Sequence, residues 1–159
     1  MKIAPLFFAL FVLANISEHR LQAADFKTAF QQTLKNEGGY VNDSRDHGGE
    51  TYCGVSRHFH PKWEGWVIVD SMKSVLGFRN TVNCSAKVRK TIDKSLAQQK
   101  RLAKLIEVFY KTEFWDPLNL DSEQHQMLAN QEFDGAVLSG IATEKRIKRQ
   151  VDEEMKSWK

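Results

Sequence analysis

Apolar residues recur at helical spacing along much of the chain. A first amphipathic helix is predicted over residues 26–37, because apolar side chains repeat every four positions after Asp25, a good N-cap residue: Phe26, Phe30 and Leu34. The pair Gly38-Gly39 follows, and glycines at such a position end helices. Residues 40–56 are rich in Asn, Asp, Gly and Thr, which predicts turns with a short β-hairpin.

The second half of the chain has clearer helical patterns than the middle. Residues 60–86 are apolar enough for a core, but Gly65 and Gly77 interrupt any long helix there. A stripe over residues 102–114 predicts a helix that ends near Pro117. Further helical segments are predicted from Ser122 onward, interrupted or closely packed at two glycines and continued by a last apolar stripe: Gly135, Gly140, Ile147, Val151, Met155 and Trp158. The predicted fold class is mainly α, with a small β or irregular element after the first helix.

The N-terminus has the pattern of a secretory signal peptide. Lys2 is followed by an almost unbroken apolar run from Ile3 to Ile16 and then by a polar stretch that ends in Ala23-Ala24. A run of this length is shorter than the roughly 20 residues that a membrane-spanning helix needs. We therefore expect residues 1–23 to be removed, a single domain over residues 24–159, a secreted or periplasmic location, and no stable membrane insertion afterwards.

Net charge and cysteine content bear on three possibilities: a nucleic-acid partner, a disulfide and a metal site. Removal of residues 1–23 changes the formal net charge from +3 to +2, which is too small to indicate a nucleic-acid partner. Cys53 and Cys84 are an even pair in an exported chain and predict a disulfide, with two free thiols as the alternative. These cysteines with His58 and His60 do not have the spacing of a familiar zinc site, so no metal or other cofactor is expected.

The loop after the first helix carries the candidate chemistry. Cleavage of a glycosidic bond needs a proton donor, usually a carboxyl group kept protonated near neutral pH. Glu37 is predicted in the last helical turn, where the negative end of the helix dipole raises the pKa of a carboxyl group, and burial beside Tyr40 acts in the same direction. Asp46, and after it Asp43, are the candidates for a second carboxylate that orients water across a cleft, although aspartates in such loops are also common turn residues.

Two blocks of the sequence have the form of conserved motifs. The first is Glu37-Gly-Gly-Tyr-Val-Asn-Asp followed by Asp46-x-Gly-Gly-x-Thr51-x-x-Gly54-Val55. The second comprises Tyr110-Lys-Thr-Glu-Phe-Trp-Asp-Pro and the helix Phe133-Asp-Gly-Ala-Val. Together they resemble the lysozyme-like muramidases of glycoside hydrolase family 108. The resemblance implies a lysozyme-like helical domain that cuts the glycan strands of peptidoglycan, with Glu37 as the catalytic glutamate and with Asp46 and Thr51 in the active-site loop.

Aromatic and polar residues of the two blocks are the candidates for substrate contact. Aromatic rings stack on sugar faces, so we expect the cleft to be lined by tyrosines and a tryptophan from these blocks, although most aromatic side chains in proteins belong to the core. The candidate substrate-binding residues are Tyr40, Asn42, Asp43, Thr51, Tyr110 and Trp115. Tyr52 is a further aromatic candidate.

Several alternatives stay open at this point. Leu138 stands where the family usually has Asn, and residues 57–100 align with no motif, so a lysozyme-like protein that binds peptidoglycan or a partner without cutting is the main alternative class. A lytic transglycosylase uses a similar glutamate, and a structural periplasmic protein would neither cut nor bind. Residues 87–104 have Asp93 as their only acidic residue among many basic ones, which is interpreted as a solvated helix face ahead of a wall-binding surface. A monomer acting on peptidoglycan is expected.

Overall fold

A computed structural model describes residues 23–158 of the 159-residue chain. The predicted signal peptide lies almost entirely outside the described residues. The described part contains six α-helices and one small sheet, with short π- and 3₁₀-helical turns after the fourth helix. In chain order the elements are α2 (Phe26–Leu34), β1 (Tyr40–Asn42), β2 (Glu50–Tyr52), β3 (Val55–Ser56), α3 (Gly65–Val75), α4 (Ala86–Leu96), α5 (Lys100–Tyr110), η1 (Lys111–Trp115), η2 (Asp116–Leu118), η3 (Leu120–Ser122), α6 (Gln126–Ser139) and α7 (Ile141–Ser157).

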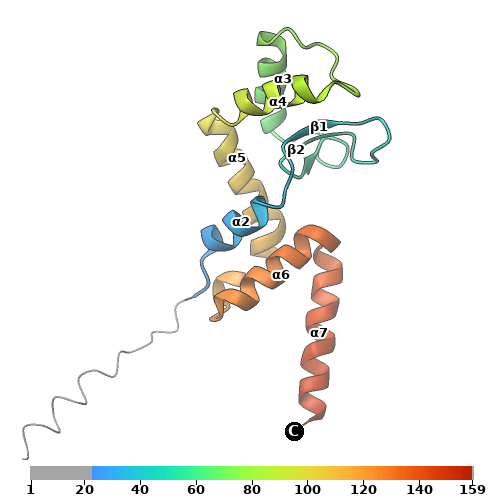
Figure 1. Ribbon diagram of the computed structural model, residues 1–159. Helices are drawn as coiled ribbons and strands as arrows, with labels where there is room; N and C mark the ends of the chain where they lie inside the picture. The colour runs from blue at the N-terminus through green and yellow to red at the C-terminus, as the bar shows by residue number, and fades with distance from the viewer. Residues whose placement is uncertain (1–22, 159) are drawn as a thin grey trace, which may run out of the picture.

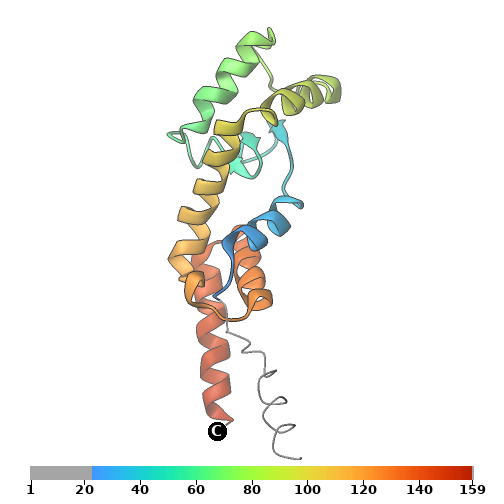
Figure 2. The ribbon, with the colours of Figure 1, turned by 90° about the vertical axis from the view of Figure 1, so that its left-hand side faces the viewer.

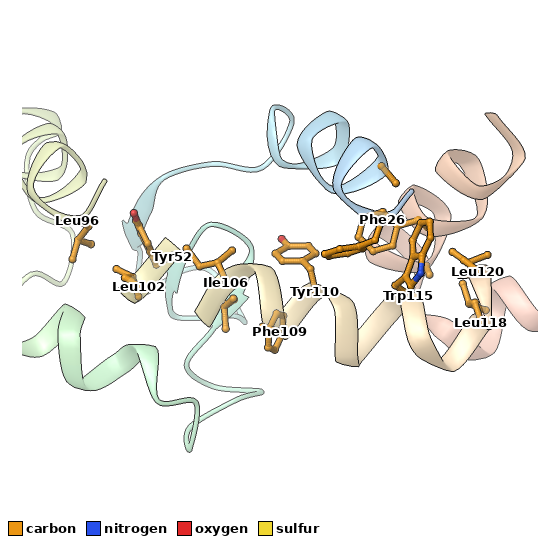
Figure 3. Packing of buried hydrophobic residues seen from close by; sticks show 14 of the residues in the cluster. Phe26, Tyr52, Leu96, Leu102, Ile106, Phe109, Tyr110, Trp115, Leu118 and Leu120 are labelled. Atoms are coloured by element: carbon orange, nitrogen blue, oxygen red, sulfur yellow. The ribbon is translucent and has the colours of Figure 1, made fainter. Parts of the chain in front are cut away.

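The molecule is elongated, and α5 runs along its middle. Figures 1 and 2 show α3, α4 and the sheet at one end, α2 and α6 at the other, and α7 extending away from the body. Buried side chains follow α5 from Leu102 through Ile106 and Tyr110, and the aromatic cluster continues to Trp115 and Phe26 (Figure 3). Among residues 23–158, every helix is too short or too polar to span a bilayer.

The sheet is a three-stranded antiparallel meander in the order β1-β2-β3. Tyr40 pairs with Tyr52, and the turn from β2 to β3 is tight because Cys53 and Gly54 both have a positive φ, of 46° and 75°. A turn with two positive φ values matches the right-handed twist of antiparallel strands. The turn lies beside α5, where Tyr110 donates a hydrogen bond to the Cys53 carbonyl at 3.0 Å and fixes the position of the turn.

Ion pairs attach this sheet to α3. Glu50 on β2 accepts hydrogen bonds from the Tyr40 hydroxyl and from Lys73 Nζ, both at 2.5 Å, and its other oxygen lies 2.7 Å from Arg57 Nε. Arg57 also contacts Asp70 on α3 at 2.7 Å. Because Glu50 and Lys73 are nearly enclosed, with about a tenth of each side chain exposed, removal of one partner would leave a buried charge, which is costly.

The predicted architecture is confirmed in type and wrong in some details. The fold is mainly α with a small β element after the first helix, as expected. Helix α2, however, ends at Leu34 rather than at residue 37, because turns with backbone hydrogen bonds to Gln32 and Thr33 already close it at Lys35 and Asn36. The poorly patterned stretch 60–86 contains a regular helix, α3.

Candidate active site

Glu37 lies half-buried in the connection between α2 and β1, facing the tight turn of the sheet. Its carboxylate is so close to Gly54 that a Cβ built on that glycine would lie 2.7 Å from Glu37 Oε2 and 3.1 Å from Cδ. The hydroxyl of Tyr110 presses against the same glycine from α5. Two segments distant in sequence, the β2–β3 turn and α5, thus lie against the Glu37 carboxyl group, and Gly54 has to be a glycine because any side chain would occupy that space.

Burial raises the pKa of Glu37 above its ordinary value, and the negative charge of Asp134 on α6 adds to the effect. Asp134 is held in place by Thr33 of α2, whose hydroxyl donates to Asp134 Oδ1 at 2.9 Å. The sequence-based reason for a raised pKa needs correction in one respect, since Glu37 lies beyond the last turn of α2. Desolvation and a neighbouring carboxylate, rather than the end of a helix dipole, favour the protonated acid.

Asp93 of α4 fixes the backbone that follows Glu37. Its Oδ1 accepts a hydrogen bond from the Tyr40 backbone N–H. A Cβ on Gly39 would lie 2.5 Å from Asp93 Oδ1 and 2.7 Å from its Cγ, so the carboxylate fills the space that a side chain at this position would need. The two glycines after Glu37 therefore differ, because a Cβ on Gly38 would meet nothing within 4 Å.

Asp46, the candidate second carboxylate, lies exposed in the loop between β1 and β2. Its Oδ1 accepts from the Gly48 backbone N–H at 2.9 Å, which is a turn-stabilising contact. Thr51 donates to the Gly49 carbonyl at 3.3 Å, and Ser56 donates to the Gly48 carbonyl at 2.6 Å. These bonds give the loop a defined shape, in which Asp46 keeps its second carboxylate oxygen without a partner among the described residues.

Asp43 and Asn42 make local contacts in the same hairpin. Arg45 binds both oxygens of Asp43, at 3.0 and 2.7 Å, and these hydrogen bonds hold the pKa of Asp43 well below its usual range. Asn42 donates to the Thr81 hydroxyl at 3.1 Å. Asp43 is therefore an ionised partner of Arg45, and both of its carboxylate oxygens are engaged by that side chain.

The predicted aromatic contacts are mostly enclosed by protein. Tyr40 is 1% exposed, and its hydroxyl contacts Glu50 and Thr81. Trp115 has no exposed surface, lies between Phe26 and Phe133, and donates to Asp121 at 2.7 Å. In this conformation neither ring is open to a sugar. Tyr110 is also buried, with 1% of its surface exposed. Its hydroxyl and the Glu37 carboxylate both lie next to Gly54.

A largely apolar hollow of about 480 Å³ lies between α2, the end of α4 and α5. Phe30, Leu34 and Tyr52 form part of its wall, and Lys100, Lys104 and Glu107 supply charged groups. Leu34 precedes Glu37 by three residues and Tyr52 directly precedes the turn beside it, so the hollow adjoins the segments that carry the site. Among the aromatic candidates, Tyr52 is the one that lines it.

Cys53 and Cys84 are free thiols, so the predicted disulfide is absent from the structure. Cys53 lies in the β2–β3 turn, where burial raises the pKa of its thiol to about 11, and Cys84 precedes α4. Within residues 23–158, no three His, Cys, Asp or Glu side chains are grouped closely enough to hold a metal ion.

Some residues of the site were missed by sequence analysis. Asp134 belonged to a recognised block but had no role, and Asp93 was noticed only as the single acidic residue of a basic segment. The isolated acidic residue could have indicated the role of Asp93, because one acidic side chain among so many basic ones is unusual for a uniformly solvated helix face. The structure brings Glu37, Gly54, Tyr110, Asp134 and Asp93 into one region, while the contacts of Asp46 and Asp43 are confined to their own loop.

A mainly helical domain with a half-buried glutamate of raised pKa next to a small sheet is compatible with a glycosidase that uses a carboxylic acid. Residues 30–140 match the family described as Glycosyl hydrolase 108, which is more than half of the chain. The chain belongs to the glycosyl hydrolase 108 family and is a lysozyme-like peptidoglycan hydrolase in general type. No curated protein and no solved structure matches it.

Proposed function

We propose that this protein is a muramidase that hydrolyses the bond from N-acetylmuramic acid to N-acetylglucosamine in peptidoglycan, with Glu37 as the general acid. The observation that supports it best is the enclosure of the Glu37 carboxyl group by Gly54 and Tyr110, with a raised pKa. A carboxyl group that stays protonated near neutral pH can deliver its proton to the leaving glycosidic oxygen.

The second group of the reaction is proposed to be Asp46. In an inverting mechanism its carboxylate takes a proton from water while that water attacks the anomeric carbon, and the bond to the leaving oxygen breaks as Glu37 protonates it. The free oxygen of Asp46 and its exposure in the hairpin loop support this role. Asn42 and Thr51 lie in the same hairpin and are proposed to border the glycan. Tyr110 is proposed to keep water from the buried side of the Glu37 carboxyl group.

The location is proposed to be secreted or periplasmic, in keeping with the apolar run from Ile3 to Ile16. Such a location would give the enzyme access to peptidoglycan. The protein is proposed to act as a monomer.

Digestion of purified peptidoglycan by residues 24–159, with products identified by mass spectrometry, tests the proposal. Wild-type protein is expected to release muropeptides with reducing ends, and Glu37→Gln is expected to release none. Anhydro products would instead identify a lytic transglycosylase. Binding of several wall types without any release would replace the enzyme with a binding protein, a function that the exposed Leu138 in place of the family's Asn makes worth testing.

A further inference from the structure

The carboxylate of Asp93 lies next to the site and has no role in the proposed reaction. It comes from α4, which lies within the family-matched residues 30–140 but outside the sequence blocks that carry the recognised motifs. Helix α4 buries Ile92 and Leu96 almost completely, with 0% and 1% of each exposed, so its position against the core is fixed. Asp93, between them, is half-buried rather than solvated.

Asp93 contacts the chain immediately after Glu37. It accepts the backbone N–H of Tyr40, which would otherwise begin β1 without this partner, and it occupies the place of a side chain at Gly39. The other end of Tyr40 is also held, because its hydroxyl bonds to Glu50 and Thr81. The connection from Glu37 to β1 is therefore anchored two and three residues after the catalytic glutamate.

The same carboxylate also lies near the opposite wall of the site. Burial raises the pKa of the Cys53 thiol and of the Tyr52 phenol, both on the β2–β3 side of the sheet, and the negative charge of Asp93 adds a smaller contribution to each shift. Gly54, which contacts Glu37, is the next residue after Cys53. Asp93 thus contacts the segment after Glu37 and is close enough to the β2–β3 turn to act on it electrostatically.

We infer that Asp93 is a positioning residue of the active site, which holds the Gly39–Tyr40 backbone so that Glu37 stays against Gly54 and Tyr110. This inference rests on the proposed role of Glu37. It makes a specific statement about the glycine pair: Gly39 is required by the Asp93 carboxylate, and Gly38 is not. Displacement of a catalytic group by about 1 Å can reduce turnover by roughly 100-fold, so an anchor of this kind acts on kcat.

The test compares Asp93→Ala, Asp93→Asn, Gly39→Ala and the double variant Asp93→Ala/Gly39→Ala in the protein of residues 24–159. Asp93→Ala is expected to lower kcat on peptidoglycan about 10- to 100-fold with KM within about twofold. Asp93→Asn keeps an oxygen acceptor for the Tyr40 N–H and is expected to retain most activity. Gly38→Ala and Lys94→Ala are the matched controls and should behave as wild type.

Gly39→Ala alone is expected to be as impaired as Asp93→Ala, because the new Cβ meets the carboxylate. In the Asp93→Ala background the same change should cost less than threefold, since the colliding group is gone. Additive losses in this double-mutant cycle, or wild-type kcat in Asp93→Ala, would overturn the inference.

Amide hydrogen exchange at Tyr40 gives a readout that does not require activity. Exchange is expected to accelerate at least tenfold in Asp93→Ala while distant core amides, such as that of Ile106, keep wild-type rates. Unchanged Tyr40 exchange would overturn the anchor even if activity fell. If the wild type cleaves no peptidoglycan but Tyr40 exchange responds as expected, the proposed function fails while the Asp93 contact stands.

Discussion

At the scale of single residues, burial of Glu37 changes the pKa of its carboxyl group and so the reactions in which it can take part. A carboxyl group on a protein surface is ionised at neutral pH and cannot act as an acid. Glu37 departs from this because Gly54 and Tyr110 exclude water from one side of it and Asp134 places a second negative charge nearby. Both effects favour the form that carries a proton, which is the form that glycosidic cleavage consumes.

The Glu37→Gln variant is expected to lose activity and gain stability. Loss of the general acid should lower kcat roughly 100- to 10,000-fold. The folded pKa of Glu37 lies above the unfolded value, so the contribution of Glu37 to stability is fully present below about pH 4.5, the ordinary value for Glu, and is lost as pH rises through the folded pKa. Thermal unfolding should therefore give equal Tm values near pH 4 and a higher Tm for Glu37→Gln at pH 7.

The exposed Glu153 provides the control for that comparison. Glu153→Gln removes a carboxyl group from the open surface of α7 and should leave the Tm at pH 7 close to that of wild type. A Glu37→Gln protein whose Tm is lower than wild type at pH 7 would contradict the view that the charged form of Glu37 is disfavoured in the folded state.

Gly54 is expected to be intolerant of any side chain. Gly54→Ala combines a φ of 75°, which costs an L-residue about 1–2 kcal/mol, with a collision against Glu37 and Tyr110. The loss of activity should be larger than the decrease in the folded fraction of the protein explains. Gly49→Ala separates the two effects, because Gly49 has a φ of 62° but open space at its Cβ. Assays of both at a temperature where each is folded should show a large kcat loss for Gly54→Ala alone.

At the scale of helices and strands, the sequence predicted what depends on local pattern. The four-residue spacing from Phe26 to Leu34, the hairpin after it and the break at Gly140 all appear in the structure. The end of α2 was misjudged, since Lys35 and Asn36 give no signal that separates a turn from a last helical residue. Helix α3 was also hard to identify, because Gly65 and Gly77 suggested interruptions of a helix, whereas Gly65 begins α3 and Gly77 follows its end.

The parts of the site that sequence analysis missed depend on contacts between distant residues. Asp93 bonds to a residue 53 positions away, and no spacing rule connects α4 with the start of β1. Nor could the pattern tell which aromatic side chains are enclosed. Tyr40 and Trp115 are residue types that stack on sugars. In the structure, however, Tyr40 bonds to Glu50 and Trp115 packs against Phe133, so both rings are inside the protein.

The contact of α6 with α7 gives a prediction at this scale. A Cβ on Gly135 of α6 would meet the carboxyl group of Glu144 on α7, with Cδ at 3.0 Å, and Glu144 is only 9% exposed. Gly135→Ala should therefore lower stability by about 1–3 kcal/mol, as overpacking does. Urea unfolding measures this, and Glu144→Ala added to Gly135→Ala should recover part of the loss. Full additivity would contradict the packing argument.

At the scale of the whole molecule, the site lies where two groups of elements meet. The sheet, α3 and α4 form one group, α2 and α6 form the other, and α5 contributes to both (Figure 3). Glu37 comes from the chain between α2 and the sheet, Gly54 from the sheet, Tyr110 from α5 and Asp134 from α6. The geometry of the acid therefore depends on the packing of both groups along α5.

Helix α7 stands outside this arrangement, and its removal tests whether the site is independent of it. It follows the family-matched residues 30–140 and contacts α6 and η2, whereas the groups around Glu37 lie on other elements. Deletion of residues 141–159 uncovers the α6 face at Gly135, so Tm should fall by several degrees. Because no described contact joins α7 to Glu37, kcat on peptidoglycan should stay within about twofold at temperatures where the shortened protein is folded. A larger fall in kcat there, with intact circular dichroism, would mean that α7 supports the site through α6 and Asp134, and the family-matched segment would then be insufficient for catalysis.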